Sequence, residues 1–179
     1  MIRIPCRAKY LRITLLSAVL GGCLTTTSLT GAPVTPVAEV ANTASNARLR
    51  VVSAEGVVRA IPSKDCLDDS APDTGVILGG RGDLQGQSRN MPNPERIGDK
   101  PFAELYIAAG KPFTLDFQVG TGSRARCALA GSFVPQAGKN YEAYAAIVNG
   151  QCALTVRLKN LADGLWKPER LTKAQNCKR

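Results

Sequence analysis

The sequence contains no histidine among its 179 residues. Histidine is the commonest general base and the commonest protein ligand of transition metals. Its absence excludes a serine–histidine–aspartate triad, a cysteine–histidine pair, a histidine-ligated zinc site and a haem held by a proximal histidine. We therefore expect a protein that is not an enzyme, with no catalytic residue, metal or cofactor. Chemistry based on carboxylates or lysine is the alternative that remains open.

The chain also lacks an apolar run long enough to cross a membrane, and it has no convincing amphipathic helix. The apolar stretch at residues 13–20 has only eight residues, whereas a membrane-spanning helix needs about 20. The net charge is +9, but no basic cluster follows residue 23. Nucleic-acid-binding proteins usually gather lysine and arginine in one patch, so we expect no nucleic-acid partner.

Residues 1–22 have the composition of an export signal. Residues 1–12 contain four basic residues and no acidic one, and the short apolar stretch follows them directly. A charged region followed by a short apolar region is typical of a secretory signal peptide, which is removed from the mature protein. A buried first strand or helix of the fold is the alternative for this segment.

The apolar stretch ends in Leu20-Gly21-Gly22-Cys23, which resembles the leader of bacterial lipoproteins: a leucine, two small residues and a cysteine. Gly21 stands where alanine or serine is more usual. The resemblance implies cleavage before Cys23 and attachment of several acyl chains there, which together hold a protein far more firmly than one chain does. An acidic residue after the cysteine typically retains such lipoproteins in the inner membrane. Because Leu24 is not acidic, the resemblance also implies a location at the outer membrane, on its periplasmic face. A secreted protein without lipid is the alternative.

Residues 23–47 are predicted to form the lipidated cysteine and a flexible tether. They are rich in threonine, alanine, serine and proline and contain no aromatic residue, lysine or arginine. Such a segment buries too little apolar surface to offset the entropy lost on ordering. A first strand packed on the domain, mainly at residues 36–40, is the alternative. The folded domain is expected over residues 48–179.

From residue 48 onward, apolar residues recur with a period of two, which predicts β-strands. In residues 113–119 four apolar residues alternate with three polar ones, as in a strand with one face in a core and the other in water. Asn149-Gly150 separates two more alternating segments and is a strong signal for a two-residue hairpin turn. Strands are predicted at 48–53, 57–61, 75–79, 102–108, 113–119, 126–134, 140–148 and 151–159.

Many short strands separated by turns predict an all-β fold, an antiparallel two-sheet sandwich preceded by the signal peptide and the tether. The stretch 132–141, in which Ser-Phe-Val-Pro is followed by Ala-Gly and a tyrosine and then by the hairpin, resembles the end of the transthyretin-like and immunoglobulin-like domains of many envelope proteins. The resemblance implies a sandwich and no particular function. Residues 80–100 are polar and rich in glycine, asparagine and proline, which predicts a long loop.

Four cysteines remain once Cys6 leaves with the signal peptide and Cys23 takes lipid. They are Cys66, Cys127, Cys152 and Cys177. An even number in an exported protein indicates disulfides, with three possible connectivities. None forms a Cys-x-x-Cys pair, so neither redox catalysis nor a zinc knuckle is expected.

The phase of the strands favours one pairing. Cys127 and Cys152 each share a face with apolar residues, so both should point into the core. In one flat meander they would lie two strands, or about 9.6 Å, apart, which is too far for a disulfide. A Cys127–Cys152 bond therefore requires the chain to cross between sheets at residues 134–139. We predict this bond together with Cys66–Cys177; a Cys66–Cys127 bond would contradict it.

Acidic residues offer two candidate sites. Asp65, Asp68, Asp69 and Asp73 lie close together in the sequence. Carboxylate oxygens suit calcium, but the spacing lacks the EF-hand pattern, so we predict a solvated acidic loop. Glu104 and Asp116 are the candidates for paired-carboxylate chemistry, but both fall on the phases of their strands that are expected to face solvent. This placement argues against catalysis.

Three other features receive structural interpretations. Trp166 is the only tryptophan, and core packing is expected, with stacking on a sugar or a partner as the alternative. Residues 81–83 spell Arg-Gly-Asp, the integrin-binding tripeptide, which short sequences often match by chance. Four basic residues would form one outer face if their strands were neighbours: Arg124, Arg126, Arg157 and Lys159. That face would meet peptidoglycan carboxylates or lipid phosphates; a solubilising surface is the preferred interpretation.

These features predict a non-enzymatic lipoprotein of the cell envelope, tethered to the outer membrane. Its domain would be a binding or structural module, and its partners would be the membrane, through the lipid anchor, and a protein or polymer of the envelope. An accessory lipoprotein of a secretion or envelope-assembly machine is the alternative. An inhibitor of host lysozyme is disfavoured, because lysozymes and this chain are both basic.

Overall fold

The computed structural model describes residues 35–93, 97–120, 127–160 and 163–178. The predicted signal peptide, Cys23 and the part of the predicted tether up to residue 34 lie outside these ranges. The strands are β1 (Asn46–Ser53), β2 (Val57–Pro62), β3 (Gly75–Leu78), β4 (Phe102–Ala108), β5 (Phe113–Val119), β6 (Cys127–Phe133), β7 (Asn140–Val148), β8 (Gln151–Lys159), β9 (Trp166–Glu169) and β10 (Thr172–Lys173). The described ranges contain no helix, and hence none of membrane-spanning length and hydropathy.

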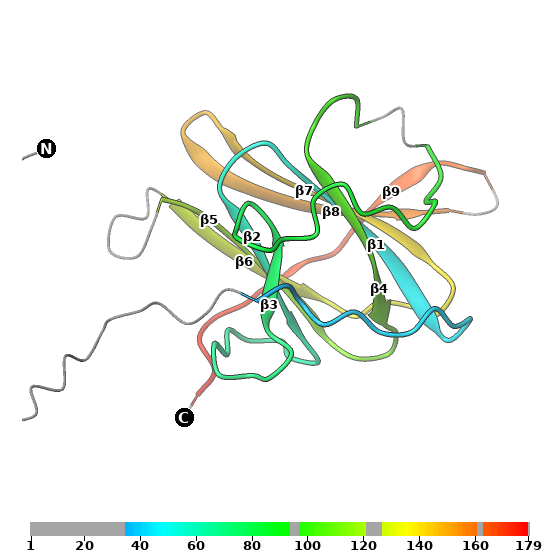
Figure 1. The fold of residues 1–179 in the computed structure, drawn as a ribbon, viewed down its shortest axis with the longest axis horizontal. Helices are drawn as coiled ribbons and strands as arrows, with labels where there is room; N and C mark the ends of the chain where they lie inside the picture. Colours follow the sequence, from blue (N-terminus) through cyan, green and yellow to red (C-terminus); the bar gives the residue numbers. More distant parts are fainter. Residues whose placement is uncertain (1–34, 94–96, 121–126, 161–162, 179) are drawn as a thin grey trace, which may run out of the picture. The chain divides into compact units, whose positions relative to one another are not determined.

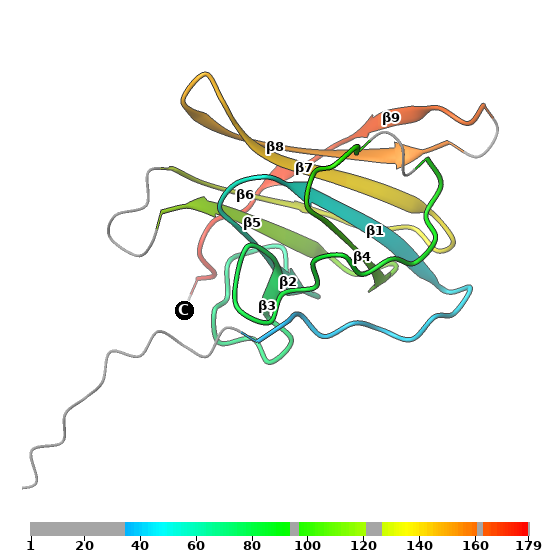
Figure 2. The ribbon, with the colours of Figure 1, turned by 45° about the horizontal axis from the view of Figure 1, so that its top comes forward.

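The strands form two five-stranded sheets, which Figures 1 and 2 show packed against each other. The first sheet has the order β4-β1-β7-β8-β9, and the second has the order β10-β6-β5-β2-β3. Neighbouring strands are antiparallel except β1 and β7, which run parallel. The structure thus confirms the predicted all-β sandwich and adds a parallel pair at the centre of the first sheet.

The hydrophobic core lies between the two sheets and follows the period of two. In β5, Phe113, Leu115 and Phe117 are buried in this core, because alternate side chains of a strand point to the same side. Leu49 of β1 and Tyr141 of β7 meet them from the other sheet and are also fully buried. The pattern read from the sequence therefore identifies the inner faces correctly.

The turn between β7 and β8 is the predicted two-residue hairpin. Asn149 and Gly150 have φ angles of 51° and 77°, as a type I′ turn requires at both central positions. Val148 and Gln151 pair directly on either side of the turn. This hairpin fixes the register of the two longest strands of the first sheet.

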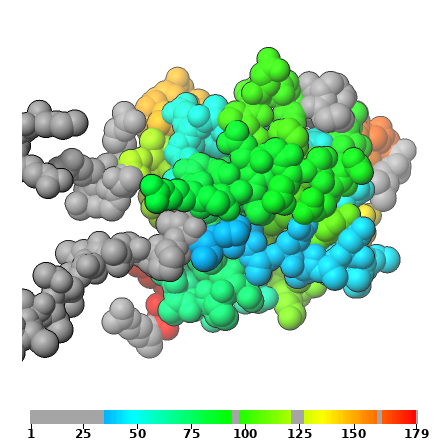
Figure 3. Space-filling view, in the orientation of Figure 1, coloured from blue at the N-terminus to red at the C-terminus, as the bar shows by residue number. Residues whose placement is uncertain are grey.

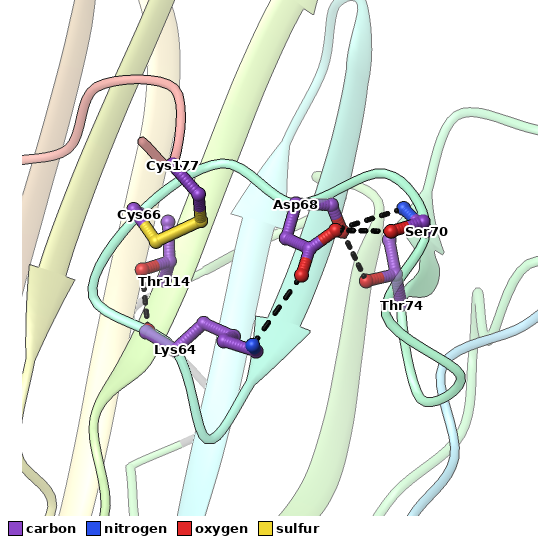
Figure 4. Close-up of a disulfide and its surroundings, with 7 residues drawn as sticks. All are labelled: Lys64, Cys66, Asp68, Ser70, Thr74, Thr114 and Cys177. Carbon is purple, nitrogen blue, oxygen red and sulfur yellow. Dashed lines mark hydrogen bonds and ion pairs between the residues drawn. A yellow bond between two sulfur atoms is a disulfide. The ribbon is translucent and has the colours of Figure 1, made fainter. Parts of the chain in front are cut away.

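Both predicted disulfides are present. Cys127 of β6 and Cys152 of β8 belong to different sheets, and their Cα atoms lie 5.7 Å apart. The chain crosses between the sheets over residues 134–139, as this bond requires. Cys66 and Cys177 form the second bond, with a Cα separation of 5.0 Å across 111 residues of sequence. It ties the C-terminal segment to the loop after β2, as Figure 4 shows.

Residues 35–47 differ from the predicted tether, because they lie on the domain. Pro36 forms a parallel bridge with Val76 at the edge of β3, and Val37 is only 4% exposed within the core. A side chain at Gly75 would overlap the Val37 backbone, so the absence of a Cβ there permits the contact. Figure 3 shows the segment as a blue ridge beside the green loop that precedes β4. Residues 36–40 thus pack on the domain, as the alternative interpretation expected, but through one isolated bridge and not as a strand.

Candidate functional site

The largest fully buried side chain among the described residues is charged and lies on the outer face of the first sheet. Arg50 of β1 is 0% exposed and sits between two carboxylates from the neighbouring strands. Its Nη2 lies 2.7 Å from Oε1 of Glu104, and its Nη1 lies 2.9 Å from Oε2 of Glu142. Sequence analysis missed this cluster, because charged residues at alternate positions of a strand usually indicate a face that is exposed to water.

The loop before β4 covers this cluster. Arg50 donates to the backbone carbonyl groups of Met91, Pro92 and Asn93. Oε2 of Glu104 accepts from the backbone N–H groups of Arg89 and Met91 and from the hydroxyl group of Ser88. The cluster therefore joins β1, β4 and β7 to the loop. The loop covers the part of the sheet's outer face on which the cluster lies.

The predicted exposure of Glu104 and Asp116 is wrong. Glu104 is 1% exposed and Asp116 is 3% exposed. Both occupy the outer faces of their strands, as their phase predicts, but the chain itself covers these faces. They also belong to different sheets, since β4 lies in the first and β5 in the second. The structure therefore does not bring them together as a catalytic pair.

The two carboxyl groups have opposite electrostatic surroundings. Burial acts to raise the pKa of Glu104, but the hydrogen bonds from Arg89, Arg50, Met91 and Ser88 outweigh it and hold the pKa below its ordinary value. Burial raises the pKa of Asp116 above its ordinary value, and the hydrogen bond from Gln118 and the nearby Arg59 only partly offset the rise. Both groups are therefore held in place by structural contacts.

Two shallow hollows lie where the N-terminal segment meets the first sheet. One has a volume of about 310 Å³ and a polar lining that includes Arg48, Tyr106 and Lys139. The other, of about 280 Å³, is lined by Glu39, Tyr106, Lys111 and others. Glu39 does not stand free in it, because its carboxylate accepts from the Arg89 side chain and from the N–H of Tyr106.

The acidic loop does not assemble a metal site from described residues. Oδ1 of Asp68 accepts from the N–H and hydroxyl groups of Ser70, and Oδ2 lies 3.3 Å from Nζ of Lys64, as Figure 4 shows. Asp69 instead pairs with Arg59 at 2.6 Å. Over the ranges that the structure describes, no three acidic or cysteine side chains converge on a possible metal position. The Arg-Gly-Asp stretch forms part of the turn after β3, where Asp83 accepts from the N–H of Gly79.

The outer face of β7, β8 and β9 carries two pairs of cation and ring. Arg157 lies 5.7 Å from the ring centroid of Tyr144, and Lys159 lies 5.4 Å from that of Trp166. Trp166 pairs with Lys159 in register on β9 and is half-buried on this outer face, so the expectation of core packing is wrong. The reason is that β9, which sequence analysis missed, extends the first sheet.

The basic face considered from the sequence depends on which strands lie side by side. Its condition was that the strand beginning near Arg126 should lie beside β8, but β6 belongs to the second sheet and β8 to the first. Arg124 and Arg126 themselves lie outside the described residues. Arg157 is exposed and Lys159 is half-buried, which leaves a smaller cationic and aromatic surface on β8 and β9.

Comparison with known proteins adds no family to this description: the sequence matches no family model and no curated protein.

Proposed function

We propose that this protein is a bacterial lipoprotein, held at the outer membrane by lipid on Cys23, whose sandwich is a non-enzymatic binding or structural module. The observation that carries the proposal is Leu20-Gly21-Gly22-Cys23 at the end of a short apolar stretch that follows four basic residues. A positively charged segment followed by a short apolar one is the order of an export signal.

The disulfides support export and set Cys23 apart. The four cysteines of the described ranges pair with one another, and such bonds persist in oxidising compartments such as the bacterial periplasm. Neither bond involves Cys23, so this cysteine remains for acylation. Cys6 would leave with the signal peptide.

The packing of residues 35–47 shortens the distance between lipid and domain. Twelve residue steps separate Cys23 from Thr35, where the described chain begins, and an extended chain of this length reaches at most about 40 Å. We therefore place the domain close to the membrane surface, within reach of other envelope components. A protein or polymer of the envelope is the proposed partner, and an accessory role in a secretion or assembly machine is the alternative.

Metabolic labelling with palmitate tests the anchor. The wild-type chain and the Cys6→Ala variant should both incorporate label, whereas Cys23→Ala should not. Labelling of Cys23→Ala, or no labelling of the wild type, would overturn the proposal. Crosslinking in cells then separates the two roles: stable recovery of inner-membrane proteins favours the assembly machine, and recovery of outer-membrane or cell-wall material favours the envelope-binding module.

A further inference from the structure

The longest open stretch of sheet edge among the described residues lies on β8. β9 pairs with β8 only through Val156–Lys159, although β8 begins at Gln151. The neighbouring residues 151–155 of β8 have no strand on that side in the described ranges. Figure 2 shows the hairpin of β7 and β8 extending beyond the end of β9. We call this five-residue stretch the β8 notch.

Two observations identify the backbone groups that face the notch. Val148 and Gln151 flank a two-residue turn, so they form a hydrogen-bonded pair and Gln151 faces β7. Pro168 has no N–H and lies opposite Arg157, which likewise directs Arg157 towards β7. Because this direction alternates along a strand, the N–H and C=O groups of Cys152 and Leu154 point into the notch.

The other sheet edges are covered, blunted or shorter, the last being residues 127–129 of β6, which lie beyond the end of β10. Residues 86–87 and Val40 bond the backbone of β4, and residues 35–37 bond β3. β9 carries Lys167 and Pro168, residue types that discourage strand addition. In contrast, residues 151–155 read Gln-Cys-Ala-Leu-Thr and contain neither charge nor proline. The notch is therefore the edge best suited to accept another strand.

The side chains beside the notch indicate what kind of strand fits. Cys152, Leu129 and Cys127 face the core but are only partly buried, so side chains on the inner side of an added strand would meet an apolar surface. On the outer face, the charged side chains of β8 are Arg157 and Lys159, which are both basic and lie just beyond one end of the notch. Outward side chains of the added strand would therefore be acidic.

A second copy of this chain fits less well than a free peptide. In the symmetric antiparallel register that bonds both notch residues, Cys152 pairs with Leu154 of the other copy, which places Gly150 opposite Val156 of that copy. Glu169 already pairs with Val156 in each copy, so the turn and β9 would compete for one position. An isolated extended segment lies in line with β9 without this overlap.

From this geometry we propose that the protein binds an extended peptide segment, alternating apolar and acidic residues, as an added strand in the β8 notch. Main-chain hydrogen bonds to Cys152 and Leu154 supply the attachment, and alternate side chains supply the selectivity. The inference deepens the proposed binding role and rests on it, naming the class of partner.

The test uses the full chain in detergent micelles and a synthetic ten-residue peptide of alternating valine and glutamate. Amide hydrogen exchange of Cys152 and Leu154 is followed by NMR. With the peptide at ten times its Kd, exchange of these two amides should slow about tenfold. A peptide N-methylated on the edge that faces β8, and one with lysine in place of glutamate, should give little protection. Equal protection by the N-methylated peptide, or none by any peptide, would overturn the proposal.

Variants of the protein separate charge from folding. Thr155 is exposed beside the notch, so Thr155→Lys should tighten binding of the acidic peptide and Thr155→Glu should weaken it, each several-fold. Gln136→Glu adds the same negative charge on the exposed connection between β6 and β7 and should leave binding unchanged. A full chain that is dimeric, with the Cys152 and Leu154 amides protected before peptide is added, would instead assign the notch to a second copy.

The two proposals fail in different ways. Peptide binding is measured with purified protein and does not depend on acylation, so a chain without lipid would overturn the anchor and leave the strand-addition result intact. Conversely, loss of peptide binding would leave palmitate labelling of Cys23 unchanged.

Discussion

Arg50 Nη1 lies 2.9 Å from Glu142 Oε2, and both side chains are 0% exposed. This pair, completed by Glu104, is the polar centre of the first sheet's outer face. Arg50 and Glu104 also bond the backbone of Met91, so the cluster links the sheet to the described part of the loop before β4.

Arg50→Met should destabilise the protein by about 3–5 kcal/mol, because it leaves two buried carboxylates without their cation. Urea denaturation measures the change. Arg157→Met, an equal substitution at an exposed position, is the control and should cost less than about 1 kcal/mol. If both substitutions have the same small effect, the buried cluster does not stabilise the fold as described.

Glu104 and Asp116 should respond to pH with opposite signs. The fold lowers the pKa of Glu104 below its ordinary value of 4.5, so its contribution to stability is present above that value and is lost as pH falls through the folded pKa. The fold raises the pKa of Asp116 above 3.8, so its ionised form destabilises the protein at neutral pH and this penalty disappears on acidification.

Substitutions that remove each charge test this sign. At pH 7, Glu104→Gln should lower the urea midpoint, whereas Asp116→Asn should leave it equal or raise it. Both differences from wild type should shrink as the pH is lowered to 3. If Asp116→Asn has a lower urea midpoint than wild type at pH 7, and this difference is smaller at pH 3, the destabilising effect described for ionised Asp116 is contradicted.

The disulfide between the sheets closes a loop with a sequence separation of 25. In the chain-entropy description, such a loop contributes about 3–4 kcal/mol to the free energy of unfolding. The double variant Cys127→Ala/Cys152→Ala should lose this amount in urea denaturation under non-reducing conditions. Non-reducing peptide mapping of the wild type provides the control; peptides joined through Cys66 and Cys127 would contradict both pairings.

Gly75→Ala should release the N-terminal segment from β3. The new methyl group would lie 2.3 Å from the backbone nitrogen of Val37, and a backbone shift of this kind costs about 1–3 kcal/mol. Limited proteolysis should then cut within residues 35–46. Gly131→Ala is the matched control, because the three atoms nearest its methyl group belong to the flexible side chain of Leu171 and none is nearer than 3.1 Å. Equal resistance of both variants to protease would argue against a packed segment.

The strands and their inner faces could be predicted because alternation and turn chemistry are local properties. Asn149-Gly150 identifies its hairpin without reference to the rest of the chain, and its positive φ angles confirm the turn. The disulfide pairing followed from the same phase, once Cys127 and Cys152 were required to face one core. These inferences use distances that strand geometry alone supplies.

The coverings of the outer faces could not be predicted, because they depend on contacts between residues far apart in sequence. Glu104 and Asp116 lie on the outward phase, and only the placement of other segments buries them. Val37 likewise belongs to a stretch with little apolar surface, and it enters the core because Gly75 admits its backbone. The short strand β9 lacks a clear alternation, so Trp166 could not be assigned to the outer face.

Mass spectrometry of the N-terminal peptide of the mature protein, isolated from membranes, tests the central claim most directly. The account predicts a peptide that begins at Cys23 and carries acyl chains on both its sulfur atom and its new amino terminus. A mature chain that begins at another residue, or an unmodified Cys23, would contradict it.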